Sequence, residues 1–220
     1  MSEQLIQAVG ECGAIVSGHF VLASGRHSDG IFDAGAVIRN ATDRLAGWVA
    51  AEMISGISGK IDTVMGVASK GNDLAGWCTN LLQGIYRQPV VNLVETTKLP
   101  DGRFDWQEPM NGMYALYQKQ VLVVEDVVTS GETVRKAVAM ARHKRAEVVG
   151  VVALCSHGKA TAGTLGVPEF HPATVIPFNN TYPPMICPLC RNFGYESIRT
   201  DFGHGQEFLD GLRQADLVRA

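Results

Sequence analysis

The chain has 220 residues, of which 46% are hydrophobic and 19% charged, a composition typical of one generous globular domain. Its formal net charge of −3 gives no reason to expect nucleic-acid binding. No apolar run approaches the length of a membrane span, and the N-terminus lacks the pattern of a signal peptide. Five cysteines do not form a dense disulfide framework, so we expect reduced thiols, a cytoplasmic location, and no membrane or nucleic-acid partner.

The first forty residues predict a helix followed by a hairpin. Leu5, Ile6 and Val9 fall on one face of a helix over 3–12. Between residues 18 and 35, apolar residues alternate around the Ser24-Gly25 pair, which is typical of a β-hairpin.

Strands and helices alternate through the rest of the chain. We expect strands at 61–67, 90–94, 121–124, 148–154 and 173–177, and helices at 42–57, 73–85, 132–143 and 206–218. This alternation predicts an α/β fold with a doubly wound parallel sheet that is covered by helices on both faces. Such sheets bind their ligands at the carboxyl ends of the strands.

The most informative stretch runs from Val121 to Thr133. Four apolar residues predict a buried strand, and the acidic pair Glu125-Asp126 stands where this strand is expected to end. A short Thr-Ser-Gly loop and a helix start follow, and together they make an anion site, because backbone N–H groups and the helix dipole favour negative charge there. The acids suit sugar hydroxyls or a magnesium ion held by the same ligand. The alternative is an ordinary strand–helix turn with solvated acids.

This stretch resembles the binding signature of type I phosphoribosyltransferases, which has an apolar strand, two acids, two apolar residues and Thr-x-Gly-x-Thr. The resemblance implies that Glu125 and Asp126 hold the ribose hydroxyls of phosphoribosyl pyrophosphate (PRPP). It implies a Mg²⁺ cofactor bound mainly through PRPP, with no metal held directly by the protein. The loop and helix start would hold the 5′-phosphate of PRPP through Val127, Val128, Thr129, Ser130, Gly131, Glu132 and Thr133.

The hairpin resembles the N-terminal hood of orotate phosphoribosyltransferases. It contains the pattern Phe-x-Leu-x-Ser-Gly-Arg-x-Ser, followed by Phe-x-Ala-Gly. Phe32 falls where that family stacks an aromatic ring against the base, although a core position in the hairpin is an equal alternative. The family often has a lysine where this chain has Ala23.

The stretch Gly66-Val67-Ala68-Ser69-Lys70-Gly71 resembles the pyrophosphate loop of the same family. The resemblance implies that Lys70 and Gly71 bind PRPP, and that a non-proline cis peptide bond lies between Ala68 and Ser69. A lysine at a helix N-terminus is a sensible partner for a doubly charged leaving group. The alternative for Lys70 is an ordinary surface lysine.

Residues 95–109 form a polar segment with two prolines, long enough to suggest a functional lid. The family has a mobile loop here that carries an essential lysine and closes over PRPP, sometimes from the neighbouring subunit. Counting from Pro89 places Lys98 at that lysine, and Arg103 is the alternative. For each of them, the other possibility is an ordinary solvated loop cation. The family's neighbouring basic residues are replaced by Val94, Glu95 and Pro100.

The loop after strand 148–154 departs from the family pattern. An arginine that binds the orotate carboxylate is common there, whereas this chain reads Cys155-Ser156-His157-Gly158-Lys159. His157 and Lys159 are the candidate replacements. The departure bears on orotate itself more than on the fold or the PRPP site.

Cys187-Pro188-Leu189-Cys190 is similar to a zinc knuckle, but a structural zinc site needs four ligands. The remaining cysteines, at positions 12, 78 and 155, show no second knuckle. A tight turn is the alternative.

The resemblance as a whole implies one phosphoribosyltransferase domain over 1–220. Residues 1–40 would form an N-terminal helix and hood, 41–160 the α/β core, and 161–220 a strand, the Cys-Pro-Leu-Cys turn and a helix. The implied protein is a homodimeric glycosyltransferase of pyrimidine biosynthesis that converts orotate and PRPP to orotidine 5′-monophosphate and pyrophosphate. Its catalytic residues would be Lys98, Asp126 and Glu125. The alternatives are transfer to another base and a non-catalytic PRPP-sensing regulator.

Overall fold

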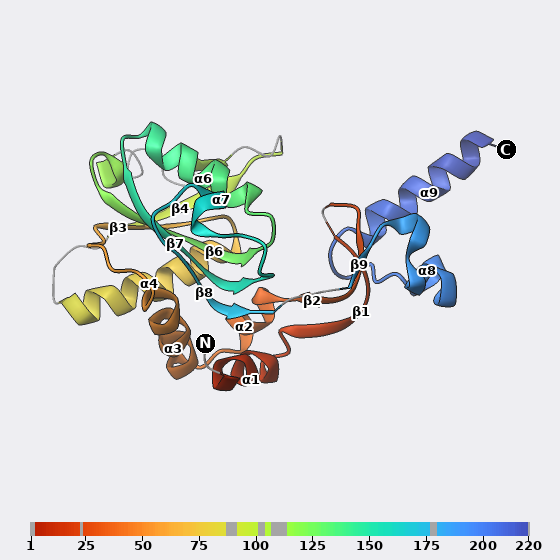
Figure 1. Ribbon diagram of the computed structural model, residues 1–220, viewed down its shortest axis with the longest axis horizontal. Helices are drawn as coiled ribbons and strands as arrows, with labels where there is room; N and C mark the ends of the chain where they lie inside the picture. Colours follow the sequence, from red (N-terminus) through yellow and green to blue (C-terminus); the bar gives the residue numbers. More distant parts are fainter. Residues whose placement is uncertain are drawn as a thin grey trace. The chain divides into compact units, whose positions relative to one another are not determined.

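The computed structural model describes residues 3–22, 24–86, 92–100, 104–106, 114–176 and 180–219. The chain divides into two compact units (Figure 1). Unit 1 comprises Met1–Ala14 and Ala34–Pro177, and unit 2 comprises Ile15–Asp33 and Phe178–Ala220. The segments 1–40 and 161–220 therefore each contribute residues to both units.

A six-stranded sheet in the order β5-β4-β3-β6-β7-β8 forms the centre of unit 1. Its strands β3, β4, β6, β7 and β8 are parallel, while β5 runs antiparallel to β4 at one edge. The parallel sheet confirms the expected α/β class. The strands are β3 Thr63–Gly66, β4 Asn92–Lys98, β5 Phe104–Trp106, β6 Gln120–Val128, β7 Glu147–Ser156 and β8 Phe170–Val175.

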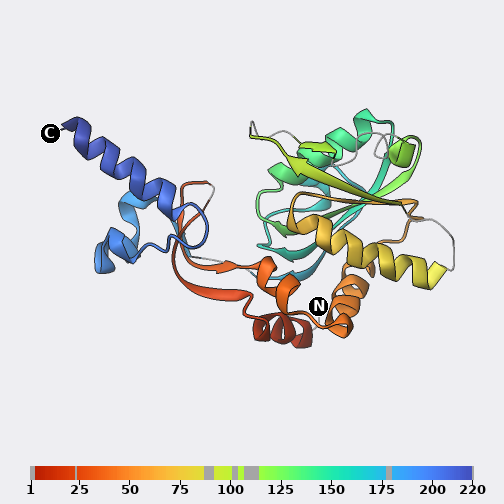
Figure 2. The same cartoon turned by 180° about the vertical axis from the view of Figure 1, so that it is seen from behind.

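Helices cover both faces of this sheet, as Figures 1 and 2 show. On one face, α3 (Asp43–Ile54) packs against α4 (Lys70–Tyr86), and α4 also contacts β3 and β6. On the other face lie α6 (Glu132–His143) and α7 (Ala162–Leu165). Unit 1 also contains the helices α1 (Glu3–Glu11) and α2 (Ala34–Asn40).

The central strand β6 carries apolar residues toward both helical layers. Val121 and Val123 belong to a buried cluster with Val134 and Val138 of α6. Side chains alternate along a strand, so Leu122 and its neighbours of the same parity face the layer of α3 and α4. Burial on both faces explains why β6 has a continuous apolar run in the sequence.

Four strands run beyond the ranges expected from the sequence, and β8 does so at its start, at Phe170 instead of residue 173. β6 continues past the acid pair to Val128, because Val127 and Val128 pair with the end of β7. For the same reason β7 includes Cys155 and Ser156, which the sequence places in a loop. β4 continues to Lys98 and pairs with β5, so this part of the expected lid segment is a β-hairpin.

Unit 2 joins two stretches that are far apart in the sequence. β1 (Ile15–Val21) and β2 (His27–Phe32) form the expected hairpin, and β9 (Thr181–Tyr182) pairs with β2 to complete a three-stranded sheet. The C-terminal stretch adds four helical segments: η1 Pro184–Ile186, α8 Pro188–Phe193, η2 Tyr195–Ser197 and α9 Gly205–Arg219. None of the helices in the described ranges combines the length and the apolar character needed to cross a lipid bilayer.

Candidate active site

The acidic pair lies in the last part of β6, and its two members differ in exposure. Glu125 is buried, with only 4% of its surface exposed, whereas Asp126 is half-buried. The backbone N–H of Asp126 donates to Glu125 Oε1 at 2.9 Å, and that of Val127 donates to Asp126 Oδ1 at 2.8 Å. Backbone N–H donors therefore hold both carboxylates at the carboxyl end of β6.

The pKa of Glu125 is raised well above its ordinary value. Burial is the main cause, since it disfavours the charged form, and the negative charge of Asp126 adds to it. The positive charge of Lys98 acts in the opposite direction. Glu125 therefore keeps its proton to a higher pH than an exposed glutamate, and Lys98 lies within electrostatic reach of it in the same chain.

Lys98 also acts on the start of α6. The pKa of Glu132 is lowered chiefly by a hydrogen bond from Lys136, with smaller contributions from the charges of Arg135 and Lys98. The Glu132 carboxylate is turned toward Lys136, whose Nζ lies 2.9 Å from Glu132 Oε1. The exposed Lys98 at the end of β4 is thus near both the acid pair and the first turn of α6.

The loop between β6 and α6 combines a left-handed glycine with exposed hydroxyl side chains. Gly131 is the N-cap of α6 with φ of 74°, and a Cβ at this position would lie 2.3 Å from Leu165 Cδ2. Thr129, Ser130 and Thr133 are exposed, and the first N–H groups of a helix have no acceptor within it. The side chain of Val128 is buried, so it can contribute only backbone groups to a ligand.

A second loop reaches the acid pair from β3 and α4. The N–H of Val67 donates to the carbonyl oxygen of Val124 at 2.9 Å. A Cβ on Gly71 would lie 2.7 Å from that same oxygen and 3.6 Å from Glu125 Oε1. Gly71 therefore lies beside the acid pair, and Lys70, the residue before it, begins α4. The peptide bond between Ala68 and Ser69 is cis, as the resemblance implies.

Two buried polar side chains, Asn72 and Thr96, hold this second loop against β4. Asn72 Nδ2 donates to the carbonyl of Thr96 at 2.8 Å, and the N–H of Thr96 donates to Asn72 Oδ1 at 3.2 Å. The Thr96 hydroxyl donates to the carbonyl of Gly66 at 2.9 Å and accepts from the N–H of Ala68 at 3.1 Å. Neither residue belongs to a motif identified from the sequence, where both stand among other polar residues with no distinguishing spacing.

The candidate base-binding residues belong to different units. His157 follows β7 in unit 1, and its backbone N–H donates to the carbonyl of Val128 at 3.1 Å, beside the hydroxyl loop. Its Nδ1–H donates to the carbonyl of Ile176 at 2.9 Å, and burial, aided by the charge of Lys159, lowers the pKa of His157. Lys159 is exposed. Phe32 lies in β2 of unit 2 and is 8% exposed, whereas Arg103 and Ala23 lie outside the described residues.

A pocket of about 660 Å³ lies elsewhere in unit 1, between α1 and α3. Gln4, Asn40 and Trp48 are among the described residues that line it, and no predicted site residue is. The candidate site lies instead at the carboxyl ends of β3 and β6, where the acid pair and the exposed hydroxyls of the following loop stand.

Residues 31–165 match the family model of the phosphoribosyl transferase domain. The orotate phosphoribosyltransferase of Sphingopyxis alaskensis is 32% identical over 178 residues, covering 80% of this chain and 85% of that protein. The orotate phosphoribosyltransferase of Desulforamulus reducens is 30% identical over 200 residues, covering 86% of this chain and 91% of that protein.

The crystal structure of orotate phosphoribosyltransferase from Aeropyrum pernix has the same fold, with a TM-score of 0.59 at 21% identity. The matched region covers 78% of this chain and 93% of the Aeropyrum pernix chain. The acid pair and both loops beside it fall inside the matched residues 31–165. This chain therefore belongs to the phosphoribosyl transferase family.

Proposed function

We propose that this protein transfers the phosphoribosyl group of PRPP to orotate, giving orotidine 5′-monophosphate and pyrophosphate. The observation that carries the proposal is the convergence of the acid pair, the hydroxyl loop, the Lys70-Gly71 loop and Lys98 in unit 1. The names of the two relatives, at 30% and 32% identity, support orotate as the acceptor.

The acid pair and the hydroxyl loop would position PRPP. Glu125 and Asp126 would hold the ribose hydroxyls, while the N–H groups and hydroxyls of residues 129–133 would hold the 5′-phosphate. Binding energy far from the reacting carbon then serves to orient it. The raised pKa of Glu125 lowers the negative charge of the pair relative to two exposed carboxylates at the same pH.

The reaction breaks the bond between C1 of the ribose and a pyrophosphate oxygen and forms a bond between C1 and a base nitrogen, which gives up its proton. Bond breaking runs ahead, so positive charge develops on C1 and negative charge on the pyrophosphate. Lys70 and Lys98 would stabilise the departing pyrophosphate. Carboxylate oxygens suit magnesium, so the acid pair fits a complex of PRPP with Mg²⁺, which would neutralise phosphate charge when bound.

The loop after β7 bears on which base the protein accepts. Lys159 is its exposed cation, and it would pair with the carboxylate of orotate in place of the family's arginine. The missing arginine favours, as a second candidate, transfer to another base. The replacement of basic residues around Lys98 favours, as a third, a PRPP-sensing regulator without catalysis.

One assay separates these three functions. Pyrophosphate release from PRPP is measured with magnesium in the presence of orotate, uracil, adenine, guanine, hypoxanthine or xanthine. We expect release with orotate alone. Release with a different base would keep the chemistry and change the specificity, and tight PRPP binding without release would favour the regulator.

The same assay tests the role of Lys98. Removal of one preorganised charge from an active site typically lowers kcat about 10²-fold or more, so we expect a loss of this size for Lys98→Ala. Lys60→Ala is the matched control, because Lys60 is exposed, precedes β3 and pairs with Asp62 at 2.8 Å. Equal turnover in the two variants would remove Lys98 from the mechanism.

A further inference from the structure

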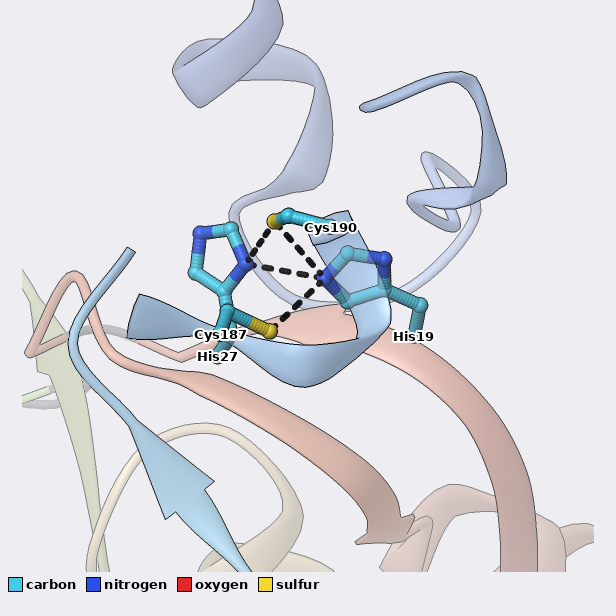
Figure 3. Close-up of side chains that lie close together, drawn as sticks. All are labelled: His19, His27, Cys187 and Cys190. Atoms are coloured by element: carbon cyan, nitrogen blue, oxygen red, sulfur yellow. Dashed lines mark hydrogen bonds between the residues drawn. The ribbon is translucent and has the colours of Figure 1, made fainter. Parts of the chain in front are cut away.

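Four side chains that commonly bind metals meet within unit 2. His19 comes from β1, His27 from β2, Cys187 from the residue before α8, and Cys190 from α8 itself, and Figure 3 shows them pointing toward one another. One ligand atom of each lies within 4.8 Å of the other three. His19, His27 and Cys187 are buried, and Cys190 is half-buried.

The distances suit a tetrahedral ion. His19 Nε2 lies 2.8 Å from His27 Nδ1, 3.7 Å from Cys187 Sγ and 3.6 Å from Cys190 Sγ, and Cys190 Sγ lies 3.1 Å from His27 Nδ1. Ligand atoms bound to zinc at about 2.0–2.3 Å are roughly 3.3–3.8 Å apart in a tetrahedron. The two distances from His19 Nε2 to the sulfurs fall in this range, and the two distances to His27 Nδ1 are shorter. Two nitrogens and two sulfurs are a donor set typical of structural zinc.

Local structure explains why the four residues meet. In the hairpin, His27 pairs with Val21, and His19 lies two residues before Val21 at the register irregularity between Ser17 and Phe20. The centroids of the two imidazole rings lie 4.9 Å apart. Cys187 is the N-cap of α8, and Cys190 follows three residues later, which places both thiols on one side of the helix. The N–H of Arg199 donates to the carbonyl of His19 at 2.8 Å and ties the two stretches together.

A neighbouring hydroxyl fixes the tautomer of His19. Ser197 Oγ donates to the carbonyl of Gly194 at 2.7 Å, so at 2.8 Å it accepts the hydrogen of His19 Nδ1. The lone pair of His19 Nε2 then points into the cluster, as a metal ligand requires. Metal-bound histidines usually have such a partner on the other ring nitrogen.

The small core of unit 2 calls for a further stabilising interaction. The described part of unit 2 contains few buried hydrophobic side chains: Phe20, Val21, Phe32, Cys187 and Ile198. Units with so small a core usually depend on disulfides or metals.

We propose that His19, His27, Cys187 and Cys190 bind one structural Zn²⁺ ion. The ion joins the hairpin to a segment 168 residues away along the chain and stabilises unit 2. Four protein ligands leave no open coordination position, so the site does not take part in phosphoribosyl transfer. From the sequence, Cys187 and Cys190 are two ligands short of such a site, and the two histidines supply them.

The direct test is the metal content of the full-length protein, purified under reducing conditions without added metal and without a metal-affinity tag. We expect inductively coupled plasma mass spectrometry to find about one zinc ion per chain. Cys190→Ser and His27→Gln should lose it. Cys12→Ser and His143→Gln are the matched controls and should retain it, since Cys12 is a free thiol in unit 1 and His143 is exposed at the end of α6.

A second measurement uses the wild-type protein, so it does not depend on whether the variants of the metal-binding residues fold. Zinc is removed from the wild-type protein and replaced by Co²⁺, whose absorption spectrum distinguishes tetrahedral sulfur–nitrogen coordination from an octahedral aqueous ion. We expect the tetrahedral spectrum and its loss on adding Zn²⁺. Zinc-free wild-type protein, zinc retained by Cys190→Ser, an octahedral cobalt spectrum or a Cys187–Cys190 disulfide would each overturn the proposal. None of these outcomes depends on PRPP chemistry.

Discussion

The adjacent carboxylates of Glu125 and Asp126 have different surroundings. Because Glu125 is buried, its ionisation changes the free energy of unfolding. The raised pKa of Glu125, due mainly to burial, means that the folded chain keeps this proton to a higher pH than the unfolded chain. The free energy of unfolding therefore falls as the pH rises from the ordinary carboxyl pKa through the raised value in the folded state. Each pKa unit is worth about 1.4 kcal/mol.

Glu125→Gln removes the ionisable group but keeps an oxygen that accepts the N–H of Asp126. We expect this variant to be more stable than the wild type at about pH 8, and the difference to shrink as the pH is lowered toward 4. Urea denaturation of both proteins without PRPP, between about pH 4 and pH 8, measures this difference in the free energy of unfolding. The exposed Glu147→Gln is the control, and a Glu125→Gln variant that is less stable at high pH would contradict the burial argument.

Single residues differ in how far the sequence reveals them. Glu125, Asp126 and Gly131 are predictable because they stand in one contiguous motif with a strand before it and a helix after it. The network of Asn72 with Thr96 is not, because its partners meet only when β3 and β4 pair. His19 and Cys190 are 171 positions apart, and nothing local connects a histidine on a strand with a cysteine on a distant helix.

The same holds for whole elements. The range predicted for α6 agrees with the structure: Gly131 in the left-handed region precedes the helix, and Arg145 with φ of 60° follows its C-cap. The end of β6 was predicted too early, since acidic residues are poor strand formers. Pairing with β7 overrides that preference and carries the strand past the acids to Val128.

Helix α4 offers a matched pair of glycines for testing how closely it must approach β6. A Cβ on Gly76 meets no atom within 4 Å, so Gly76→Ala should raise the free energy of unfolding by about 0.5–1 kcal/mol. A Cβ on Gly71 would lie 2.7 Å from a backbone oxygen of β6. We expect Gly71→Ala to lower the free energy of unfolding by about 1–3 kcal/mol, as overpacking does.

The two glycine variants should also differ in ligand binding. Gly71→Ala pushes the start of α4 away from the acid pair, so its Kd for PRPP, measured by calorimetry, should rise, while that of Gly76→Ala stays unchanged. Similar stability and affinity in both variants would show that the close approach of α4 to Val124 is not required.

At the scale of the whole molecule, the proposed PRPP residues 70–71, 98 and 125–133 all lie in unit 1, and the proposed zinc ligands all lie in unit 2. Each ligand should therefore stabilise its own unit. PRPP with magnesium at about 100 times its Kd adds about 2.7 kcal/mol, which corresponds to a rise in Tm of roughly 5–10 °C for a unit of this size. Removal of zinc should lower the stability of unit 2 instead.

Differential scanning calorimetry of the full chain tests this division. We expect two transitions, of which PRPP with magnesium shifts one and a zinc-selective chelator shifts the other. Asp126→Ala should abolish the first shift and leave the second, while Cys190→Ser should do the reverse. A single transition that moves with both treatments would mean that the two units unfold together, because cooperative unfolding transmits the stabilisation of one unit to the other.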